Sequence, residues 1–196
     1  PATRLADVPL IQYQQVMPQF ATALGIPVIE GRFFKEDDTG DRPLVAVINE
    51  SARKRFFPNV NPIGKRVYPN PPESTITKSL PSPDYRSPRL TIIGVIGDVR
   101  QFGLNRPSQP GLFVPYLQGT AKDNQTPSNK MFLFVKTDSD PLRFANVTRR
   151  IIQSLDSEQP VADVYTMEQR LRVSLATQRF QFVLFGAFAA VALLLA

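Results

Sequence analysis

The chain lacks two residue types on which much enzyme and metal chemistry depends. Its 196 residues contain no Cys and no His. The absence of Cys excludes disulfides and thiolate metal sites, and the absence of His removes the commonest general base and a common zinc ligand. Ser-His-Asp and Cys-His catalysis therefore cannot occur within this chain. A carboxylate-dependent enzyme is still an alternative, but the sequence defines no pair of opposed acidic residues for it.

Two short stretches look like ligand sites but lack the required spacing. The acidic residues Glu36–Asp38 and Asp41 do not follow the alternating pattern of a calcium loop, so we expect a solvated loop. Gly94 and Gly97 do not match a phosphate-binding glycine pattern. They predict a strand that ends in a turn, with a bulge at Gly94 and with Asp98 bonded to the turn backbone. We therefore predict no catalytic, cofactor-binding or metal-binding residue and no cofactor.

The chain is basic, with 23 Lys and Arg against 17 Asp and Glu, a net charge of +6 and a pI near 9.8. The basic residues are scattered, and Arg53–Arg55 is the one run, followed at once by Phe56 and Phe57. This pattern indicates a short helix with a solvated basic face, and attraction to an anionic membrane surface is a second interpretation. No nucleic-acid partner is predicted.

The last residues form a long apolar run. Phe180–Ala196 is apolar except for Gln181, and a bilayer core needs roughly 20 apolar residues. A buried C-terminal helix is the alternative, but the run lacks the polar stripe of such a helix. We expect a truncated transmembrane segment from about residue 180, and we expect the chain to be a piece of a longer membrane protein, since Pro1 is not an initiator Met.

A strand-helix-strand pattern occurs near each end of the chain. In the first, Pro18 begins a helix that Gly25 ends, and 26–29 is the following strand. In the second, strand 131–136 precedes a helix that Asp140 caps, and strand 161–165 follows. The residues Phe144, Val147, Ile151 and Leu155 give that second helix one apolar face. Two such units commonly pair into one α+β sheet with both helices on one face.

The middle of the chain predicts a separate, mostly β lobe. Its predicted strands are 44–48, 66–68, 90–100 and 113–116, and Pro115 indicates that the last of them is an edge strand. Asn49 is the expected N-cap of a helix that Pro58 ends. The stretch 69–89 is rich in Pro, Ser and Thr and predicts an exposed connection.

These patterns predict a discontinuous domain. We expect residues 1–42 and 130–166 to form one lobe, 43–117 to be inserted as the second lobe, and 118–129 to be a loop. Residues 167–196 are expected to form one helix that enters the membrane, with Thr166 and Gln169 as its capping box.

Five stretches give the chain a family resemblance. They are VMPQFATALGIPVIEGRFF, VAVINESARKRFFPNVNPIGKRV, IIGVIGDVRQFGL, LFVPY and the final TMEQRLRVSLATQRFQFVLFGAFAAVALLLA. In this order the chain resembles the MacB-like periplasmic core domain followed by the start of the FtsX-like permease region, as in acidobacterial-type ABC transporter permeases. The loops at 69–89 and 118–130 match least.

The resemblance implies a non-catalytic, two-lobed extracytoplasmic domain with a porter-like lobe, in a permease of the inner membrane. It implies a cytoplasmic ABC ATPase as partner, a permease homodimer, a possible periplasmic adaptor, and lipid contacts of the C-terminal helix. Residues 1 to about 179 would lie on the periplasmic or extracellular side. The domain would relay ATP-driven motion across the membrane for efflux or for activation of a partner.

A membrane-anchored sensor or binding module without an ATPase is the alternative function. Arg170, Arg172 and Arg179 precede the apolar run, and the positive-inside tendency would place them in the cytoplasm. Long domains cross the membrane largely regardless of charge, so the outside location is the favoured prediction.

Overall fold

The computed structural model describes residues 11–67, 89–99, 107–119 and 131–172. The chain divides into two compact units, of which the first comprises residues 1–100 and 108–134 and the second comprises 101–107 and 135–196. Each unit is described by itself. Across the described residues, no helix combines the length and the apolar character needed to cross a bilayer. The apolar run from Phe180 lies outside them, as does the Pro-rich stretch except for Arg89.

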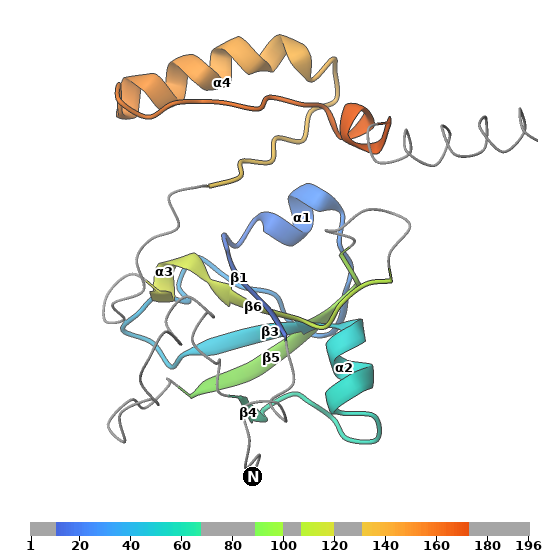
Figure 1. Cartoon of the computed structure of the whole chain (residues 1–196). Helices are drawn as coiled ribbons and strands as arrows, with labels where there is room; N and C mark the ends of the chain where they lie inside the picture. The colour runs from blue at the N-terminus through green and yellow to red at the C-terminus, as the bar shows by residue number, and fades with distance from the viewer. Residues whose placement is uncertain (1–10, 68–88, 100–106, 120–130, 173–196) are drawn as a thin grey trace, which may run out of the picture. The chain divides into compact units, whose positions relative to one another are not determined.

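The first unit is built on one mixed sheet of six strands (Figure 1). The strands are β1 (Gln12–Val16), β2 (Val28–Gly31), β3 (Val45–Asn49), β4 (Arg66–Val67), β5 (Leu90–Ile96) and β6 (Gly111–Pro115). Their order is β1-β6-β3-β5-β2, and β4 pairs with β5 beside this path. The pairs β1–β6 and β3–β5 are parallel, and the other pairs are antiparallel.

In the described part of the first unit, three helices accompany this sheet: α1 (Phe20–Leu24), α2 (Glu50–Phe56) and α3 (Tyr116–Gly119). Gly25 ends α1 in the left-handed conformation (φ 66°), which glycine adopts without a steric penalty. The Asn49 side chain caps α2 by accepting a hydrogen bond from the Ala52 N–H. The end of α1 at Gly25 and the N-cap of α2 at Asn49 were both predicted and are confirmed. Together the helices and the sheet make this unit α+β.

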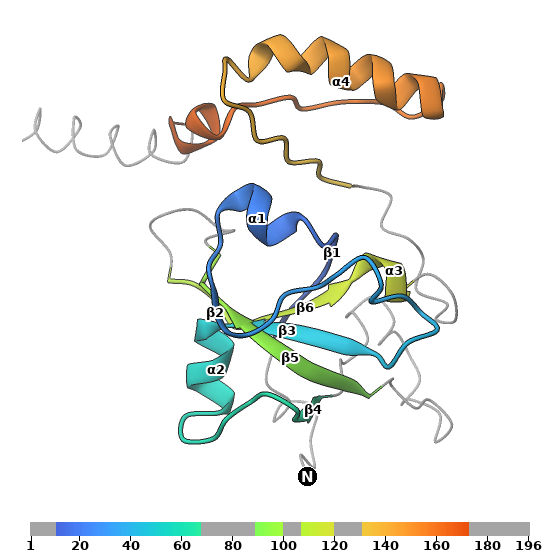
Figure 2. The same ribbon diagram turned by 180° about the vertical axis from the view of Figure 1, so that it is seen from behind.

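Successive side chains of a strand point to opposite faces of the sheet, and here both faces are apolar. One cluster contains Ala46 and Ile48 of β3 together with Ala52 of α2, and Phe56 and Phe57 pack against it. The other contains Val45 and Val47 of β3 with Phe113, and Phe20 of α1 packs against that cluster. Helices α1 and α2 therefore cover opposite faces, which the reverse view in Figure 2 also lets the reader follow.

A bulge in β5 keeps both faces apolar. Ala46 pairs with Ile92, but Val47 pairs with Gly94, so Ile93 is one extra residue on β5. An extra residue reverses the alternation of every side chain that follows it. Val95 therefore joins the α2 side and Ile96 the α1 side. The predicted bulge at Gly94 is confirmed.

Glycine at this bulge permits a close backbone approach. A Cβ on Gly94 would lie 2.1 Å from the Arg32 carbonyl oxygen, and one on Gly31 would lie 2.2 Å from the Ile93 carbonyl oxygen. Gly31 and Gly94 are also paired across the antiparallel β2–β5 ladder. Side chains at these positions would force the two strands apart, so the junction of β2 with β5 requires glycine on both.

The prediction that β6 is an edge strand was wrong. β6 lies between β1 and β3, and its residues are buried. Pro115 is tolerated because it is the last residue of the strand, beyond the pairing of Phe113 with Val47. At this point the Val45 N–H donates to the side chain of Gln118 instead. Helix α3, which supplies Gln118, was not predicted, and residues 118 and 119 of the expected loop belong to it.

The expected strand-helix-strand pairings differ from the structure. β1 and β2 are the opposite ends of the strand order rather than neighbours. Within residues 131–172, neither 131–136 nor 161–165 forms a strand. A strand needs a hydrogen-bonded partner, which neither segment has among the described residues, and Asp163 has a left-handed φ of 56°, which interrupts an extended chain.

The expected division into two lobes stays a prediction. The sheet adds one fact to it: β1 and β2, from residues 1–42, hydrogen-bond to β6 and β5, from 43–117. The two predicted segments therefore share a sheet.

The described part of the second unit centres on α4 (Leu142–Leu155). Asp140 was predicted as the N-cap, but Pro141 occupies that position and has no side-chain cap hydrogen bond. The Asp140 carboxylate still accepts a hydrogen bond from the Leu142 N–H at the start of the helix. The capping box is confirmed, because the Thr166 hydroxyl accepts from the Gln169 N–H and the Gln169 side chain accepts from the Thr166 N–H.

We expect Gly94→Ala to lower the free energy of unfolding by about 2–3 kcal/mol, because the new methyl group meets a backbone carbonyl that cannot move aside. Gly25→Ala is the control: its Cβ meets nothing within 4 Å, so only the left-handed strain of about 1 kcal/mol applies. Urea unfolding followed by circular dichroism measures both. If the two variants lost the same free energy of unfolding, the close backbone approach of β2 and β5 at Gly94 would be contradicted.

Candidate functional site

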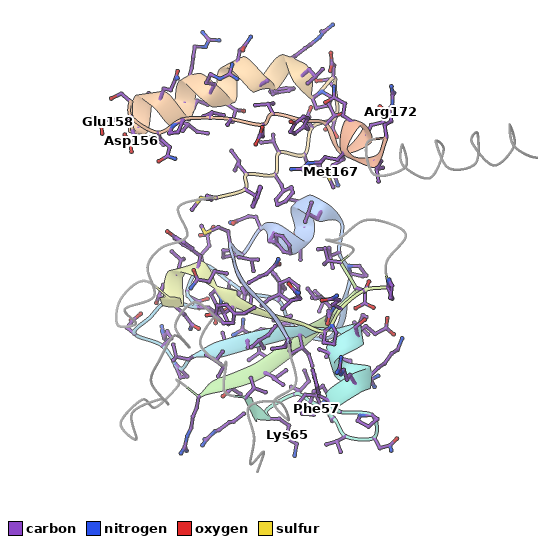
Figure 3. The ribbon with its side chains drawn as sticks, in the orientation of Figure 1. Phe57, Lys65, Asp156, Glu158, Met167 and Arg172 are labelled. Carbon is purple, nitrogen blue, oxygen red and sulfur yellow. The ribbon has the colours of Figure 1, made fainter. Side chains whose placement is uncertain are left out.

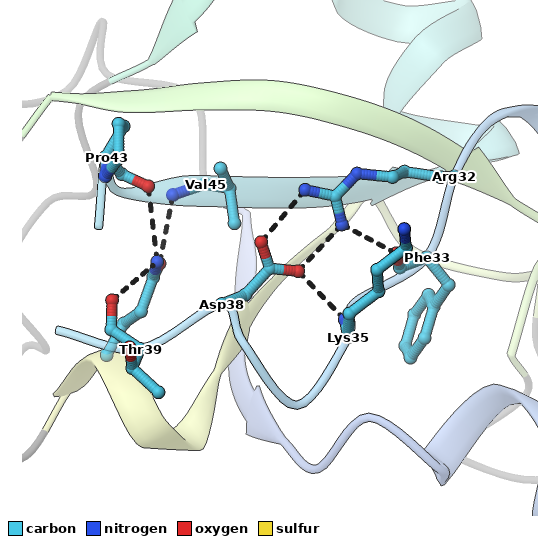
Figure 4. Close-up of polar contacts among 8 residues, drawn as sticks. Arg32, Phe33, Lys35, Asp38, Thr39, Pro43 and Val45 are labelled. Carbon is cyan, nitrogen blue, oxygen red and sulfur yellow. Dashed lines mark hydrogen bonds and ion pairs between the residues drawn. The ribbon is translucent and has the colours of Figure 1, made fainter. Parts of the chain in front are cut away.

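The most closely tied polar cluster of the first unit joins Arg32 to Asp38. The Arg32 guanidinium donates two hydrogen bonds to the Asp38 carboxylate, at 2.7 and 2.9 Å, and the Lys35 N–H donates a third at 2.8 Å (Figure 4). The Asp38 side chain is only 10% exposed. The hydrogen bonds from Arg32 lower the pKa of Asp38, despite the opposing effect of burial, and raise the pKa of Arg32.

This cluster corrects the expectation of a solvated acidic loop. Asp38 is buried and fastens the loop from β2, whereas Glu36 and Asp37 are exposed. The sequence signal was Arg32, six residues before Asp38, a pair that can close a loop. Both carboxylate oxygens of Asp38 accept from Arg32, and one also accepts from the Lys35 N–H, so the carboxylate holds the loop in place.

Gln118 of α3 also holds the loop between β2 and β3, through contacts near the start of β3. Its amide oxygen accepts from the Val45 N–H at 3.0 Å, and its amide nitrogen donates to the Thr39 and Pro43 carbonyls, each at 3.2 Å. One side chain of α3 thereby joins the loop to the start of β3 (Figure 4). Nothing in the sequence pattern marked Gln118, because all three partners are more than 70 residues away.

Asn49 is the buried polar residue at the other end of β3, with 2% of its surface exposed. Its amide oxygen accepts from the Ala52 N–H at 3.0 Å and from the Gly111 N–H at 2.7 Å, and its amide nitrogen donates to the Gln109 carbonyl at 2.8 Å. The sequence predicted the helix cap, and the fold adds the two contacts to the segment that begins β6.

Asp98 also contacts the first turn of α2. Its carboxylate accepts from the Ser51 N–H at 2.9 Å and from the Ser51 hydroxyl at 2.7 Å. These contacts were not predicted; the expected bond of Asp98 to its own turn stays a prediction, since residues 100–106 lie outside the described part of the chain. A carboxylate at this position favours the helix electrostatically, because the first turn leaves N–H groups unpaired.

The basic run on α2 is partly neutralised. Arg53 forms an ion pair with Glu30 of β2 at 2.9 Å, Lys54 pairs with Glu50 at 2.7 Å, and Arg55 lies over the ring of Phe56. These contacts fit the predicted short helix with a basic face.

These polar clusters stabilise the fold by connecting loops to strands and helices. The buried members, Asn49 and Asp38, bond to backbone groups or to one arginine, and no further ligand is needed to satisfy them. In residues 11–67, 89–99, 107–119 and 131–172, no three acidic residues gather in a way that could hold a metal ion. No site residue was predicted from the sequence, and the polar groups described above offer no pair of opposed carboxylates.

Exposed apolar side chains are the feature that points to a partner surface. In the first unit, Met131, Phe132 and Leu133 are each more than 60% exposed, although Phe134 packs edge-on against Phe20 with ring centres 6.1 Å apart. In the second unit, the predicted apolar face of α4 is present, but the helix has no buried residue. The side chains of that face are all more than 40% exposed: Phe144, Val147, Ile151 and Leu155. Figure 3 draws the side chains along α4. Apolar surface of this extent indicates a binding face.

We expect Asn49→Ala to lower the free energy of unfolding by about 3 kcal/mol, because it removes the helix cap and leaves buried backbone groups of Gly111 and Gln109 unpaired. Asn61→Ala is the matched control, since Asn61 is exposed and, among the described residues, its side chain accepts one hydrogen bond, from the Ile63 N–H; it should cost less than about 1 kcal/mol. Thermal unfolding of both variants tests this. A small loss for Asn49→Ala would show that water replaces its contacts.

Comparison with known proteins places most of the chain in one family. Residues 3–153 match the MacB-like periplasmic core domain. The macrolide export ATP-binding/permease protein MacB of Aggregatibacter actinomycetemcomitans is 30% identical over 98 residues, which are 50% of this chain and 13% of that relative. The chain therefore matches only a small part of that relative's length.

Two solved structures are also similar. The periplasmic region of MacB from Actinobacillus actinomycetemcomitans aligns with a TM-score of 0.48 at 21% identity, over 73% of this chain and 56% of that chain. The extracellular domain of the noncanonic ABC-type transporter YknZ from Gram-positive bacteria aligns with a TM-score of 0.37 at 18% identity, over 54% of this chain and 43% of that chain.

Proposed function

Because the chain belongs to the family of MacB-like periplasmic core domains, we propose that it is the extracytoplasmic part of an ABC-type permease. The family match over residues 3–153 is the observation that carries this proposal. Its role is to receive motion driven by a cytoplasmic ABC ATPase and to transmit it to a partner or a cargo outside the membrane, for efflux or for activation of that partner.

The chemistry of the chain supports a mechanical role. With no Cys and no His, the chain lacks thiol and imidazole groups, and its buried polar side chains hydrogen-bond to loops and to strand ends. Exposed apolar side chains on α4 and on 131–133 suit contacts with other protein surfaces. The domain is therefore proposed to be non-catalytic, with ATP hydrolysis assigned to another subunit or domain.

The membrane arrangement follows from the same proposal. The apolar run 180–196 crosses the inner membrane, and residues 1 to about 179 lie on the periplasmic or extracellular side. A helix that begins at the Thr166 capping box and continues into the bilayer would transmit motion better than a flexible linker. The permease acts as a homodimer, lipid surrounds the C-terminal helix, and an adaptor in the periplasm is a further partner.

The porter-like lobe is proposed to combine residues 1–42 with 130–166. β1 has a free edge, since it pairs only with β6 in the described sheet. Residues Met131–Lys136 are apolar and β-prone, and Phe134 already contacts Phe20, which follows β1 closely. Pairing of this segment with β1 would satisfy its backbone groups and give α4 a sheet on which to bury its apolar face.

The alternative function is a membrane-anchored sensor or binding module without an ATPase. Three arginines before the apolar run, Arg170, Arg172 and Arg179, favour it, because they fit a cytoplasmic location under the positive-inside tendency.

Thiol labelling of the full-length protein tests the location, after removal of any cysteine outside these 196 residues. Asn59→Cys and Ser157→Cys place one exposed thiol in each unit. In cells with a permeable outer membrane, a maleimide that cannot cross the inner membrane should label both variants without lysis. The unsubstituted chain is the control and should not react. Labelling only after lysis would overturn the permease proposal and favour the sensor.

Hydrogen exchange tests the porter-like lobe. If 131–136 pairs with β1 in the full-length protein, its backbone amides should exchange at least about 100-fold more slowly than those of the exposed residues 157–159. Phe134→Ala should accelerate the exchange of 131–136 and leave β3 unchanged, because it removes the contact with Phe20. Fast exchange of 131–136 in the unsubstituted protein would show that the segment is unpaired.

A further inference from the structure

Every methionine of the chain lies on its surface. The sequence has three, and Met17, Met131 and Met167 are 47%, 73% and 62% exposed. Methionine is more often a core residue, because its thioether is apolar and adapts to irregular gaps. Since the sequence has no Cys, these thioethers hold all of its sulfur atoms. Their exposure gives an oxidant direct access to them.

Two of the three methionines flank one aromatic contact of the first unit. The Met17 carbonyl accepts a hydrogen bond from the Phe20 N–H at 3.0 Å, so Met17 begins the turn that leads from β1 into α1. Met131 lies three residues before Phe134, whose ring packs edge-on against the ring of Phe20 with centres 6.1 Å apart. Each methionine is therefore three residues from the contact that joins the segment 131–136 to α1.

Oxidation changes the polarity of such a side chain. Hydrogen peroxide transfers one oxygen atom to the thioether sulfur: the O–O bond breaks, an S–O bond forms, the sulfur loses two electrons, and the peroxide is reduced to water. The sulfoxide that results is polar and strongly hydrated. If 131–136 pairs with β1, as proposed above, a sulfoxide on Met17 or Met131 must lose part of its hydration beside apolar neighbours, which costs free energy. Oxidation therefore opposes the pairing.

We propose that Met17 and Met131 form an oxidation site that controls whether the segment 131–136 pairs with β1. The reduced thioethers permit the pairing, and their oxidation to sulfoxides by a peroxide releases the segment. Met167, which Figure 3 labels, belongs to the second unit and takes no part. The site rests on the proposed function, which includes this pairing and places the domain outside the cytoplasm, in a more oxidising compartment.

The test treats the full-length protein in nanodiscs with hydrogen peroxide. Mass spectrometry should find sulfoxide at Met17 and Met131, and the amides of 131–136 should then exchange at least about tenfold faster. Methionine sulfoxide reductases should restore slow exchange. Met17→Leu with Met131→Leu should abolish the response, because leucine keeps an apolar side chain of similar volume that peroxide does not oxidise. Met167→Leu is the matched control and should respond like the unsubstituted protein.

Three results would overturn the oxidation site. In the first, the double leucine variant still responds to peroxide, so another group causes the change. In the second, both methionines are oxidised but 131–136 exchanges as slowly as before, which leaves the pairing with β1 intact and removes this inference alone. In the third, the segment exchanges fast before any oxidation, which removes the pairing as well. Thiol labelling is independent of all three, so the extracytoplasmic location stands or fails separately. Each leucine variant should match the unsubstituted protein in circular dichroism melting, and Met131→Leu alone should halve the response or more if the double variant folds poorly.

Discussion

The extra residue in β5 is the constraint on which the rest of the first unit depends. Two parallel strands, β3 and β5, form the centre of the sheet, and Ile93 shifts their register by one position. Without this shift, Val95 and Ile96 would each face the wrong cluster. The bulge also brings β2 so close that Gly31 and Gly94 are needed at the junction. Two covered faces, and hence two sides on which α1 and α2 pack, follow from one local irregularity.

Buried polar side chains stabilise the connections between these strands. Asn49 joins the end of β3 to the segment before β6, Gln118 joins the loop before β3 to α3, and Asp38 closes the loop after β2. Each forms hydrogen bonds to groups distant in sequence or to loop backbone, so each raises the cost of separating the strands. Such fixed connections are consistent with the proposed role of transmitting motion, because a flexible domain would absorb the displacement.

The two units differ in how far their apolar residues are covered. The first unit buries both faces of its sheet, whereas α4 has a regular apolar face and no buried residue. An isolated helix of 14 residues is marginal in water, so α4 gains most from packing on another surface. The apolar residues of 131–133 have the same need. In the porter-like lobe proposed above, the segment 131–136 would pair with β1, and α4 would pack on the sheet that this pairing extends. This arrangement would cover both apolar surfaces.

Local patterns in the sequence determined the helix caps at Asn49 and Thr166, the end of α1 at Gly25, the strands of the central sheet, and the bulge at Gly94. These depend on interactions within a few residues, which is why one sequence suffices. Tertiary structure alone decided the strand order, the central place of β6 despite Pro115, the burial of Asp38, and the partners of Asp98 and Gln118. These depend on groups brought together from distant positions, and no local pattern encodes which of several apolar strands become neighbours. The lack of His and Cys limited the chemistry from the start, but only the fold decided that Asn49 and Asp38 are buried and hydrogen-bonded.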